Sequence, residues 1–176
     1  MIPNILTTVR LIFVPIFAFL VLGGHPAAAA VVFTLSGVTD IIDGYIARKY
    51  QMITDFGKVY DPFVDKLMQI TAVVCLVIAE VIPLWILIIV IVKEVSMIVI
   101  GGILYLRKIV VHSNWYGKVA TVVFYAIVFL FIVWRQMPSV CTYALLVIMI
   151  FAMAFSAIAY LVDTIRHYDE KRVKKV

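Results

Sequence analysis

The sequence carries little charge and almost no cysteine. Charged residues make up 14% of its 176 residues, whereas hydrophobic residues make up 65%. About a quarter of the residues of an average soluble domain are charged, so this composition argues against a soluble globular domain and against a disordered chain. The two cysteines, Cys75 and Cys141, lie inside apolar runs and give no support to a disulfide framework. The sequence also has no cluster of Cys and His residues of the kind that binds zinc.

Long apolar runs dominate the chain. No Asp, Glu, Lys or Arg occurs from position 136 to position 162, and about 20 apolar residues are enough for a helix to cross a bilayer. Turn-forming residues separate six such runs. The runs are Ile5–Leu22, Ala27–Arg48, Gly57–Val81, Pro83–Leu106, Trp115–Trp134 and Ser139–Asp163. The sequence therefore predicts an all-α polytopic membrane protein, with six transmembrane helices and a short N-terminal interfacial segment, in one domain over residues 1–176.

The positive charges gather at one set of the predicted helix ends. The net charge is +5. Lys and Arg concentrate around residues 48–58, around residues 107–118 and in a basic tail at 166–176, whereas Arg135 lies alone at the opposite ends. The positive-inside rule then places both termini in the cytoplasm, as expected for an integral protein of a bacterial-type cytoplasmic membrane. We attribute the excess charge to loops and anionic lipid headgroups, not to nucleic acid.

Four acidic residues occur where acids are costly. Asp40 and Asp43 lie three positions apart in the second run, and Asp61 and Asp65 lie four positions apart in the third. Both spacings place side chains on one helix face, and an ionised Asp within a membrane costs about 3 kcal/mol. Hard cations such as Mg²⁺ or Mn²⁺ favour all-oxygen ligands. Four carboxylates are enough for two such ions, an arrangement used in phosphoryl transfer.

Small residues accompany these acids. Gly44 and Ala47 share a face with Asp40 and Asp43, and Gly57 lies one turn before Asp61. Little side-chain bulk on this face allows a ligand to approach the backbone, and Arg48 offers a guanidinium for a diphosphate. The alternative is that the small residues serve helix packing, as they often do in membranes.

These residues together resemble the signature D-x-x-D-G-x-x-A-R-(x8)-G-x-x-x-D-x-x-x-D of the CDP-alcohol phosphotransferases, which covers residues 40–65 here. All eight fixed positions are filled: Asp40, Asp43, Gly44, Ala47, Arg48, Gly57, Asp61 and Asp65. The family joins a CDP-activated lipid or alcohol to an acceptor hydroxyl and releases CMP. The start of the chain, Pro3 to Arg10, also resembles the P-N-x-x-T-x-x-R start of the phosphatidyltransferase branch.

The resemblance implies a role for each matching residue. Asp40, Asp43 and Asp61 would hold two Mg²⁺ or Mn²⁺ ions per site, with Asp65 also near the metal and acting as the general base. The expected contacts to the CDP lipid are Asn4, Thr7, Gly44, Ala47, Arg48, Thr54 and Gly57. Asn4, Thr7 and Arg10 share a helix face and would close the nucleotide site from the cytoplasmic side, unless they are ordinary polar residues of an interfacial helix.

The acceptor is less well specified. Lys93 and Glu94 lie inside the fourth run, where charge is costly, and Arg107 and Lys118 lie around the following loop. Lys93, Arg107 and Lys118 would bind an acidic acceptor such as glycerol 3-phosphate. Gly117-Lys118 followed by Thr121 is similar to the G-K-x-x-T region of bacterial phosphatidylglycerophosphate synthases. That group usually has Arg-Glu where this chain has Lys93-Glu94.

Several alternatives remain open at this stage. Related enzymes use phosphatidylglycerol, in cardiolipin synthases, or inositol phosphate as the acceptor. A cation-binding transporter would also explain acids inside membrane helices, although it does not explain Arg48, Gly44 and Gly57 at their offsets. We expect CDP-diacylglycerol, membrane lipid and a second copy of the chain as partners, with the active site facing the cytoplasm.

Overall fold

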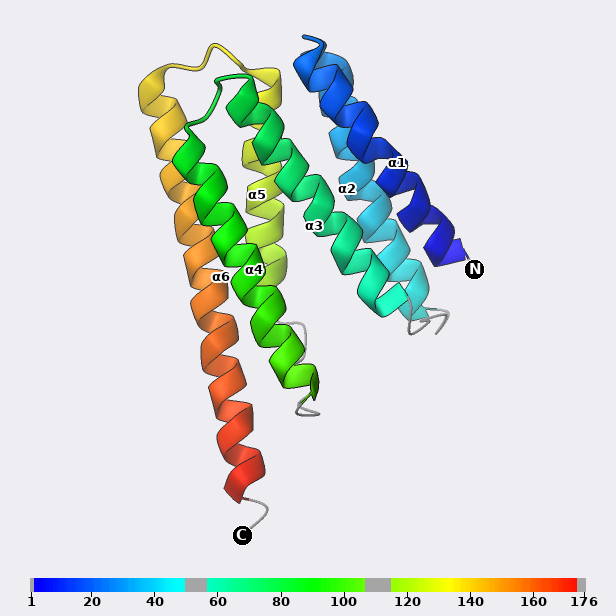
Figure 1. The fold of residues 1–176 in the computed structure, drawn as a ribbon, viewed down its shortest axis with the longest axis vertical. Coiled ribbons are helices and arrows are strands. Elements are labelled where there is room, and N and C mark those ends of the chain that lie inside the picture. The colour runs from blue at the N-terminus through cyan, green and yellow to red at the C-terminus, as the bar shows by residue number, and fades with distance from the viewer. Residues whose placement is uncertain (1, 50–56, 107–114, 174–176) are drawn as a thin grey trace. The chain divides into compact units, whose positions relative to one another are not determined.

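The computed structural model describes residues 2–49, 57–106 and 115–173, which form six helices and no strand (Figure 1). The helices are α1 (Ile2–Leu22), α2 (Pro26–Lys49), α3 (Gly57–Ile78), α4 (Leu84–Leu106), α5 (Trp115–Val133) and α6 (Ser139–Val173). The predicted all-helical class is therefore confirmed for this part of the chain, and each helix falls on one of the six apolar runs.

The ends of several helices differ from the prediction. The residues predicted as a separate interfacial segment form the first turn of α1, which begins at Ile2. Helix α6 continues past the predicted end at Asp163 to Val173, so the basic tail begins as helix. The apolar pattern marks where hydrophobic residues stop, but the residues that follow include Arg166, Glu170, Lys171 and Arg172, which are good helix formers.

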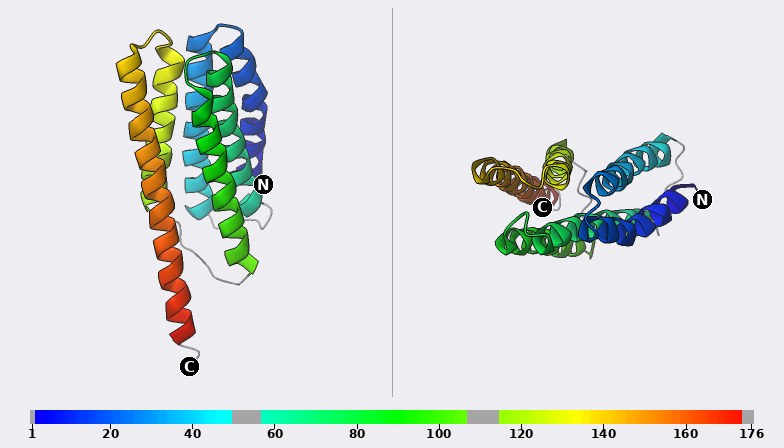
Figure 2. Two further views of the ribbon diagram at one scale, coloured as in Figure 1. Left: turned by 60° about the vertical axis from the view of Figure 1, so that its left-hand side comes forward. Right: turned by 90° about the horizontal axis from the view of Figure 1, so that it is seen from above.

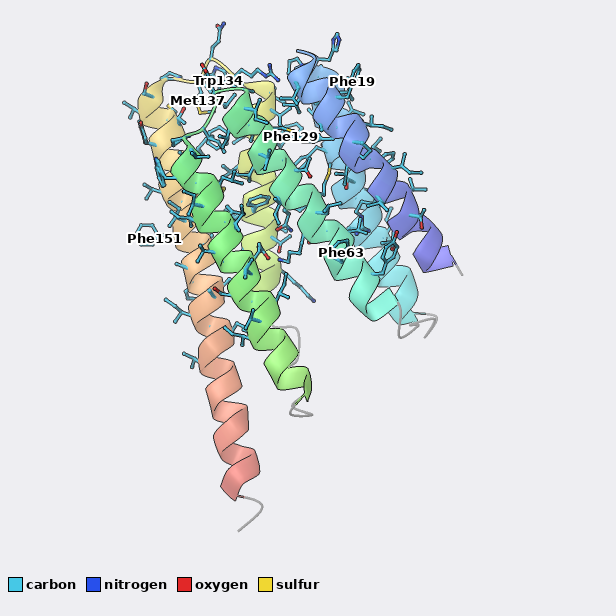
Figure 3. The ribbon with its side chains drawn as sticks, in the orientation of Figure 1. Phe19, Phe63, Phe129, Trp134, Met137 and Phe151 are labelled. Carbon is cyan, nitrogen blue, oxygen red and sulfur yellow. The ribbon has the colours of Figure 1, made fainter. Side chains whose placement is uncertain are left out.

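One helix meets a strict test for a membrane span. Within the described residues, Ser139–Tyr160 of α6 is long and apolar enough to cross a bilayer. Shorter apolar stretches occur at Thr7–Leu22, Pro26–Asp40 and Gly117–Val133. Large apolar side chains are also exposed on several helices: Phe19 of α1 is 75% exposed and Phe151 of α6 is 71% exposed (Figure 3). A surface of this kind suits a lipid environment better than water.

The chain divides into two compact units. The first comprises Met1–Leu87 and Val128–Met137, and the second comprises Ile88–Ile127 and Pro138–Val176. Helices α4 and α5 each contribute to both units. Helices α1, α2 and α3 belong entirely to the first unit, and the sequence signature lies within it.

In the first unit, α1 packs against both α2 and α3 (Figure 2). The side chains of Phe17 and Phe33 are buried, and their ring centroids lie 5.5 Å apart. Ala29 and Ala30 of α2 are also buried, and small residues allow helices to approach closely. At the far end of α1 the Arg135 guanidinium donates a hydrogen bond to the Val21 carbonyl, where a cation complements the helix dipole.

Two helices of the first unit end in the same left-handed turn. Gly24 has a φ of 78° after α1, and Glu80 has a φ of 56° after α3. In each turn the next amide donates a 2.9 Å hydrogen bond to the carbonyl five positions earlier, which is the Schellman pattern. The turn at Glu80 ends α3 at Ile78, not at the predicted Val81. Pro26 then begins α2 directly after the first turn, a position that suits proline.

Replacing Glu80 by glycine is expected to stabilise the protein. A left-handed conformation costs a residue with a Cβ about 1 kcal/mol, and glycine adopts it freely. We expect Glu80→Gly to raise the melting temperature in detergent by about 2–4 °C. Glu80→Ala removes the same carboxylate but keeps the Cβ, so it should melt close to wild type. Equal melting temperatures for the two variants would contradict this explanation.

In the second unit, a buried stripe runs along α6 at helical spacing. It comprises Leu146, Met149, Met153 and Ser156. A Cβ built on Gly117 of α5 would lie 3.9 Å from the Ser156 hydroxyl, which places these two helices close together at that level. Glu94 of α4 is fully buried in this unit. The opposite face of α6, with Phe151 and Phe155, is exposed and apolar.

Candidate active site

Two contacts fix the register of α1 against α2. Phe17 lies against Phe33, and Arg10 pairs with Asp40. The two contacts are seven residues apart on both helices, which is close to two helical turns. The same antiparallel spacing brings position 43 level with Thr7, whose side chain is fully buried. Arg10, one of the residues of the predicted nucleotide face, is therefore directed at α2, on the level of the first signature acid.

Arg10 is the cation beside the first signature acid. Its Nη1 atom lies 2.7 Å from Asp40 Oδ1; the Arg10 side chain is fully buried, whereas the Asp40 side chain is 42% exposed. The acidic signature thus receives one compensating charge from the protein itself. Arg10 joins α1 to α2 through a carboxylate predicted to bind metal, and its expected place on the nucleotide side stays a prediction.

The last signature acid is held by a neighbour on its own helix. The amide Nε2 of Gln69 donates a hydrogen bond of 2.8 Å to Asp65 Oδ2. The two residues are four positions apart on α3, and Gln69 is only 4% exposed. A local bond of this kind restricts the rotamer of the carboxylate.

Asp40 and Asp65 belong to the same end of the first unit. Asp40 lies in the second half of α2 and Asp65 in the first half of α3, and both helices pack against α1. Asp43 and Asp61 lie on the same two helix segments, although their side chains are outside the described part of the chain. We call this end, with its four signature aspartates, the carboxylate end.

The other predicted CDP contacts are placed only as backbone. Helix α2 carries Gly44, Ala47 and Arg48 in its last turns, and Gly57 is the first residue of α3. Asn4 lies in the first turn of α1. All of these positions cluster near the carboxylate end. Thr54 lies outside the described residues.

The donor atoms described at the carboxylate end fit a hard divalent cation. Asp40 and Asp65 offer carboxylate oxygens, the ligand type of Mg²⁺ and Mn²⁺. Arg10 contacts the Asp40 carboxylate and Gln69 contacts the Asp65 carboxylate. An ionised carboxylate has about four acceptor positions, so ligation of a metal is compatible with these contacts. Among the side chains that the structure describes, no three acidic, His or Cys groups gather around one point.

Lys93 and Lys118, two of the predicted acceptor residues, belong to the second unit. Lys93 and Glu94 form an ion pair with a separation of 2.6 Å between Nζ and Oε1, and Lys93 is 18% exposed. Lys118 is exposed on α5. Arg107 lies outside the described residues.

Gln69 was missed from the sequence, and Arg10 was singled out but its pairing with Asp40 was not predicted. Gln69 could have been found, because it stands one turn after Asp65 on the same helix face. The pairing of Arg10 with Asp40 depends on how α1 docks on α2, and the only signal for it is a single arginine in an otherwise apolar run.

The six helices and the acidic signature define a helical protein with an aspartate-rich end. The chain belongs to the CDP-alcohol phosphatidyltransferase family, whose model matches residues 1–164. The predicted family is thereby confirmed, and the match includes the whole signature.

Several curated proteins are similar to this chain in sequence. A probable phosphatidylglycerophosphate synthase of Mycobacterium tuberculosis is 36% identical over 126 residues, covering 68% of this chain and 60% of that protein. A cardiolipin synthase (CMP-forming) of Streptomyces coelicolor is 37% identical, covering 68% of this chain and 59% of that protein. A CDP-diacylglycerol–glycerol-3-phosphate 3-phosphatidyltransferase of Bacillus subtilis is 32% identical, covering 68% and 69%. The matched region is thus about 60% of the length of the first two relatives.

Proposed function

We propose that this protein transfers the phosphatidyl group of CDP-diacylglycerol to the hydroxyl of glycerol 3-phosphate, giving phosphatidylglycerophosphate and CMP. Family membership supports the CDP-dependent transfer. The names of the Mycobacterium tuberculosis and Bacillus subtilis relatives support this donor and acceptor. Neither finding favours a cation transporter.

The observation that carries the proposal is the placement of Asp40 and Asp65. They are the first and last acids of the signature, they lie on two helices that both pack against α1, and a specific neighbour holds each one. Acids kept only for solubility would lie at the surface without such partners. Held carboxylates at one end of a helical unit are what a metal-dependent transfer to phosphorus requires.

Asp40, Asp43 and Asp61 would hold two Mg²⁺ or Mn²⁺ ions, with Asp65 close to them. When bound, the ions supply positive charge that offsets the diphosphate and the departing CMP. Gly44, Ala47 and Gly57 leave room for the CDP group near the backbone. Arg48 supplies a planar cation for its phosphates. Asn4, Thr7 and Thr54 add hydrogen-bonding groups on the nucleotide side.

Asp65 acts as the general base in this proposal. It accepts the proton of the acceptor hydroxyl as that oxygen bonds to the phosphatidyl phosphorus, and the bond from this phosphorus to the bridging oxygen of CMP breaks. A base must lie within hydrogen-bond reach of the proton it removes. The bond from Gln69 keeps the Asp65 carboxylate in one orientation for this step.

Lys93, Arg107 and Lys118 are the proposed contacts to the phosphate of the acceptor. Cationic side chains suit an acidic acceptor. A second candidate acceptor is phosphatidylglycerol, because the Streptomyces coelicolor relative is named a cardiolipin synthase and is similar to the same degree. We further propose that the protein is an integral membrane homodimer in one domain, with both termini and the carboxylate end at the cytoplasmic face.

Purified protein incubated with CDP-diacylglycerol and a panel of acceptors tests this function. Glycerol 3-phosphate, phosphatidylglycerol and inositol phosphate are supplied separately, and lipid products are identified by mass while CMP is measured. We expect phosphatidylglycerophosphate with glycerol 3-phosphate. EDTA should lower CMP release at least 100-fold, with recovery on excess Mg²⁺ or Mn²⁺, because the metal stabilises the transferred charge by several kcal/mol.

The panel separates the possible failures. If a lipid product forms only with phosphatidylglycerol, the proposed acceptor is wrong, but the proposed phosphatidyl transfer stands. Activity that persists in EDTA would contradict a metal site. No CMP release with any acceptor, in protein that remains folded, would overturn the transferase itself.

A further inference from the structure

Gln69 is a polar side chain in an apolar setting. It is 4% exposed, and its neighbours along α3, Met68, Ala72 and Val73, are fully buried. Burying an amide costs free energy unless its polar atoms find partners. The amide is therefore retained for its contact, and the contact that the structure gives it is with Asp65.

The chemistry of this contact sets its direction. An ionised carboxylate only accepts hydrogen bonds, so the amide nitrogen of Gln69 faces Asp65 and donates to Oδ2 across 2.8 Å. Both residues stand on α3, four positions apart. Because the helix fixes their separation, the bond holds the carboxylate without depending on the docking of any other helix.

We propose that Gln69 is a positioning residue, which holds the Asp65 carboxylate in the orientation needed at the carboxylate end. The inference rests on the proposed function, in which Asp65 is the base and lies near the metal. Residues that orient the side chains around a metal commonly contribute about 10–100-fold in affinity or activity. Gln69 should contribute on that scale, although it touches neither substrate nor metal.

A purely structural role for Gln69 gives different expectations. A bond that only stabilises α3 would affect melting temperature, and activity would fall only as far as the protein unfolds. A bond that orients Asp65 would affect the maximal rate and Mn²⁺ affinity in protein that is still folded. Gln69→Met tests this directly, because methionine has a similar volume and no donor. Gln69→His returns an N–H donor one turn from Asp65.

The experiment uses the full chain in detergent micelles. For wild type, Gln69→Met and Gln69→His we would measure kcat and KM for CDP-diacylglycerol, melting temperature, and Mn²⁺ affinity by electron paramagnetic resonance. Cys75→Ala is the matched control, since Cys75 is buried on the same helix, ten positions from Asp65. It should lower the melting temperature without changing kcat or Mn²⁺ affinity.

We expect Gln69→Met to lower kcat and Mn²⁺ affinity by about 10–100-fold with little change in KM, and Gln69→His to recover most of the loss. Wild-type values in Gln69→Met would overturn the inference and leave the proposed function intact. Weakened Mn²⁺ binding in Gln69→Met, combined with a wild type that releases no CMP, would keep the inference and reject the function. Wild-type protein that binds no Mn²⁺ would overturn the inference, as would losses in Gln69→Met that only follow melting temperature.

Discussion

Asp65→Asn is expected to reduce the rate of CMP release roughly 1,000-fold, because general bases contribute about 10²–10⁴-fold. The asparagine amide has nearly the same shape, but it is not basic. Its carbonyl oxygen can still accept the hydrogen bond that Gln69 donates to Asp65. We therefore expect the activity to fall because the base is missing and not because the protein unfolds. The melting temperature in detergent should be close to that of wild type.

Glu80→Gln is the matched control for this substitution. Glu80 follows the opposite end of α3 and is exposed, so the change removes the same charge by the same isosteric replacement. CMP release should remain at the wild-type level. Substantial activity in Asp65→Asn would remove Asp65 from the role of base, and an equal loss in both variants would point to net charge.

Local sequence determines most of the helix pattern. The apolar runs predicted six helices, and Gly24 and Pro26 marked the turn between α1 and α2 where the structure has it. Glu80 was not predictable in the same way, because side chains with a Cβ seldom adopt a left-handed conformation. The boundary of α6 was missed because hydrophobicity ends before helix propensity does.

In the candidate site as well, features within one helix were predictable and contacts between helices were not. The spacing of Asp40, Asp43, Asp61 and Asp65 is a property of single helices, so periodicity alone predicts that they lie on two helix faces. The pairing of Arg10 with Asp40 is a property of two docked helices. Periodicity gives the buried face of α1 and of α2, but not the register between them. That register becomes known only through contacts such as Phe17 with Phe33.

Asp40→Ala is expected to destabilise the protein more than Arg10→Met, although both break one ion pair. Arg10 is fully buried, whereas Asp40 is 42% exposed. Removal of one partner of a buried pair costs about 3–5 kcal/mol, and partial exposure of Asp40 screens the interaction. We expect a loss of about 2–3 kcal/mol for Asp40→Ala, because the guanidinium stays buried without that carboxylate. We expect about 1 kcal/mol for Arg10→Met, because water reaches Asp40.

This asymmetry predicts a rescue. In the double variant Arg10→Met/Asp40→Ala the buried charge is gone, so its stability should rise above that of Asp40→Ala alone and approach that of Arg10→Met. Thermal unfolding in detergent, followed by circular dichroism in EDTA, measures all four proteins without a contribution from metal. Arg135→Met is the matched control, because Arg135 bonds to a backbone carbonyl at the far end of α1.

Arg135→Met combined with Asp40→Ala should be additive, since the two sites lie at opposite ends of α1 and share no partner. If the stability losses of Arg10→Met and Asp40→Ala were also additive, the burial of the guanidinium would not depend on Asp40. The expected coupling would instead mean that the first signature acid serves two purposes. It neutralises a cation at the interface of α1 and α2, and it presents a carboxylate at the end of the unit where the proposed transfer takes place.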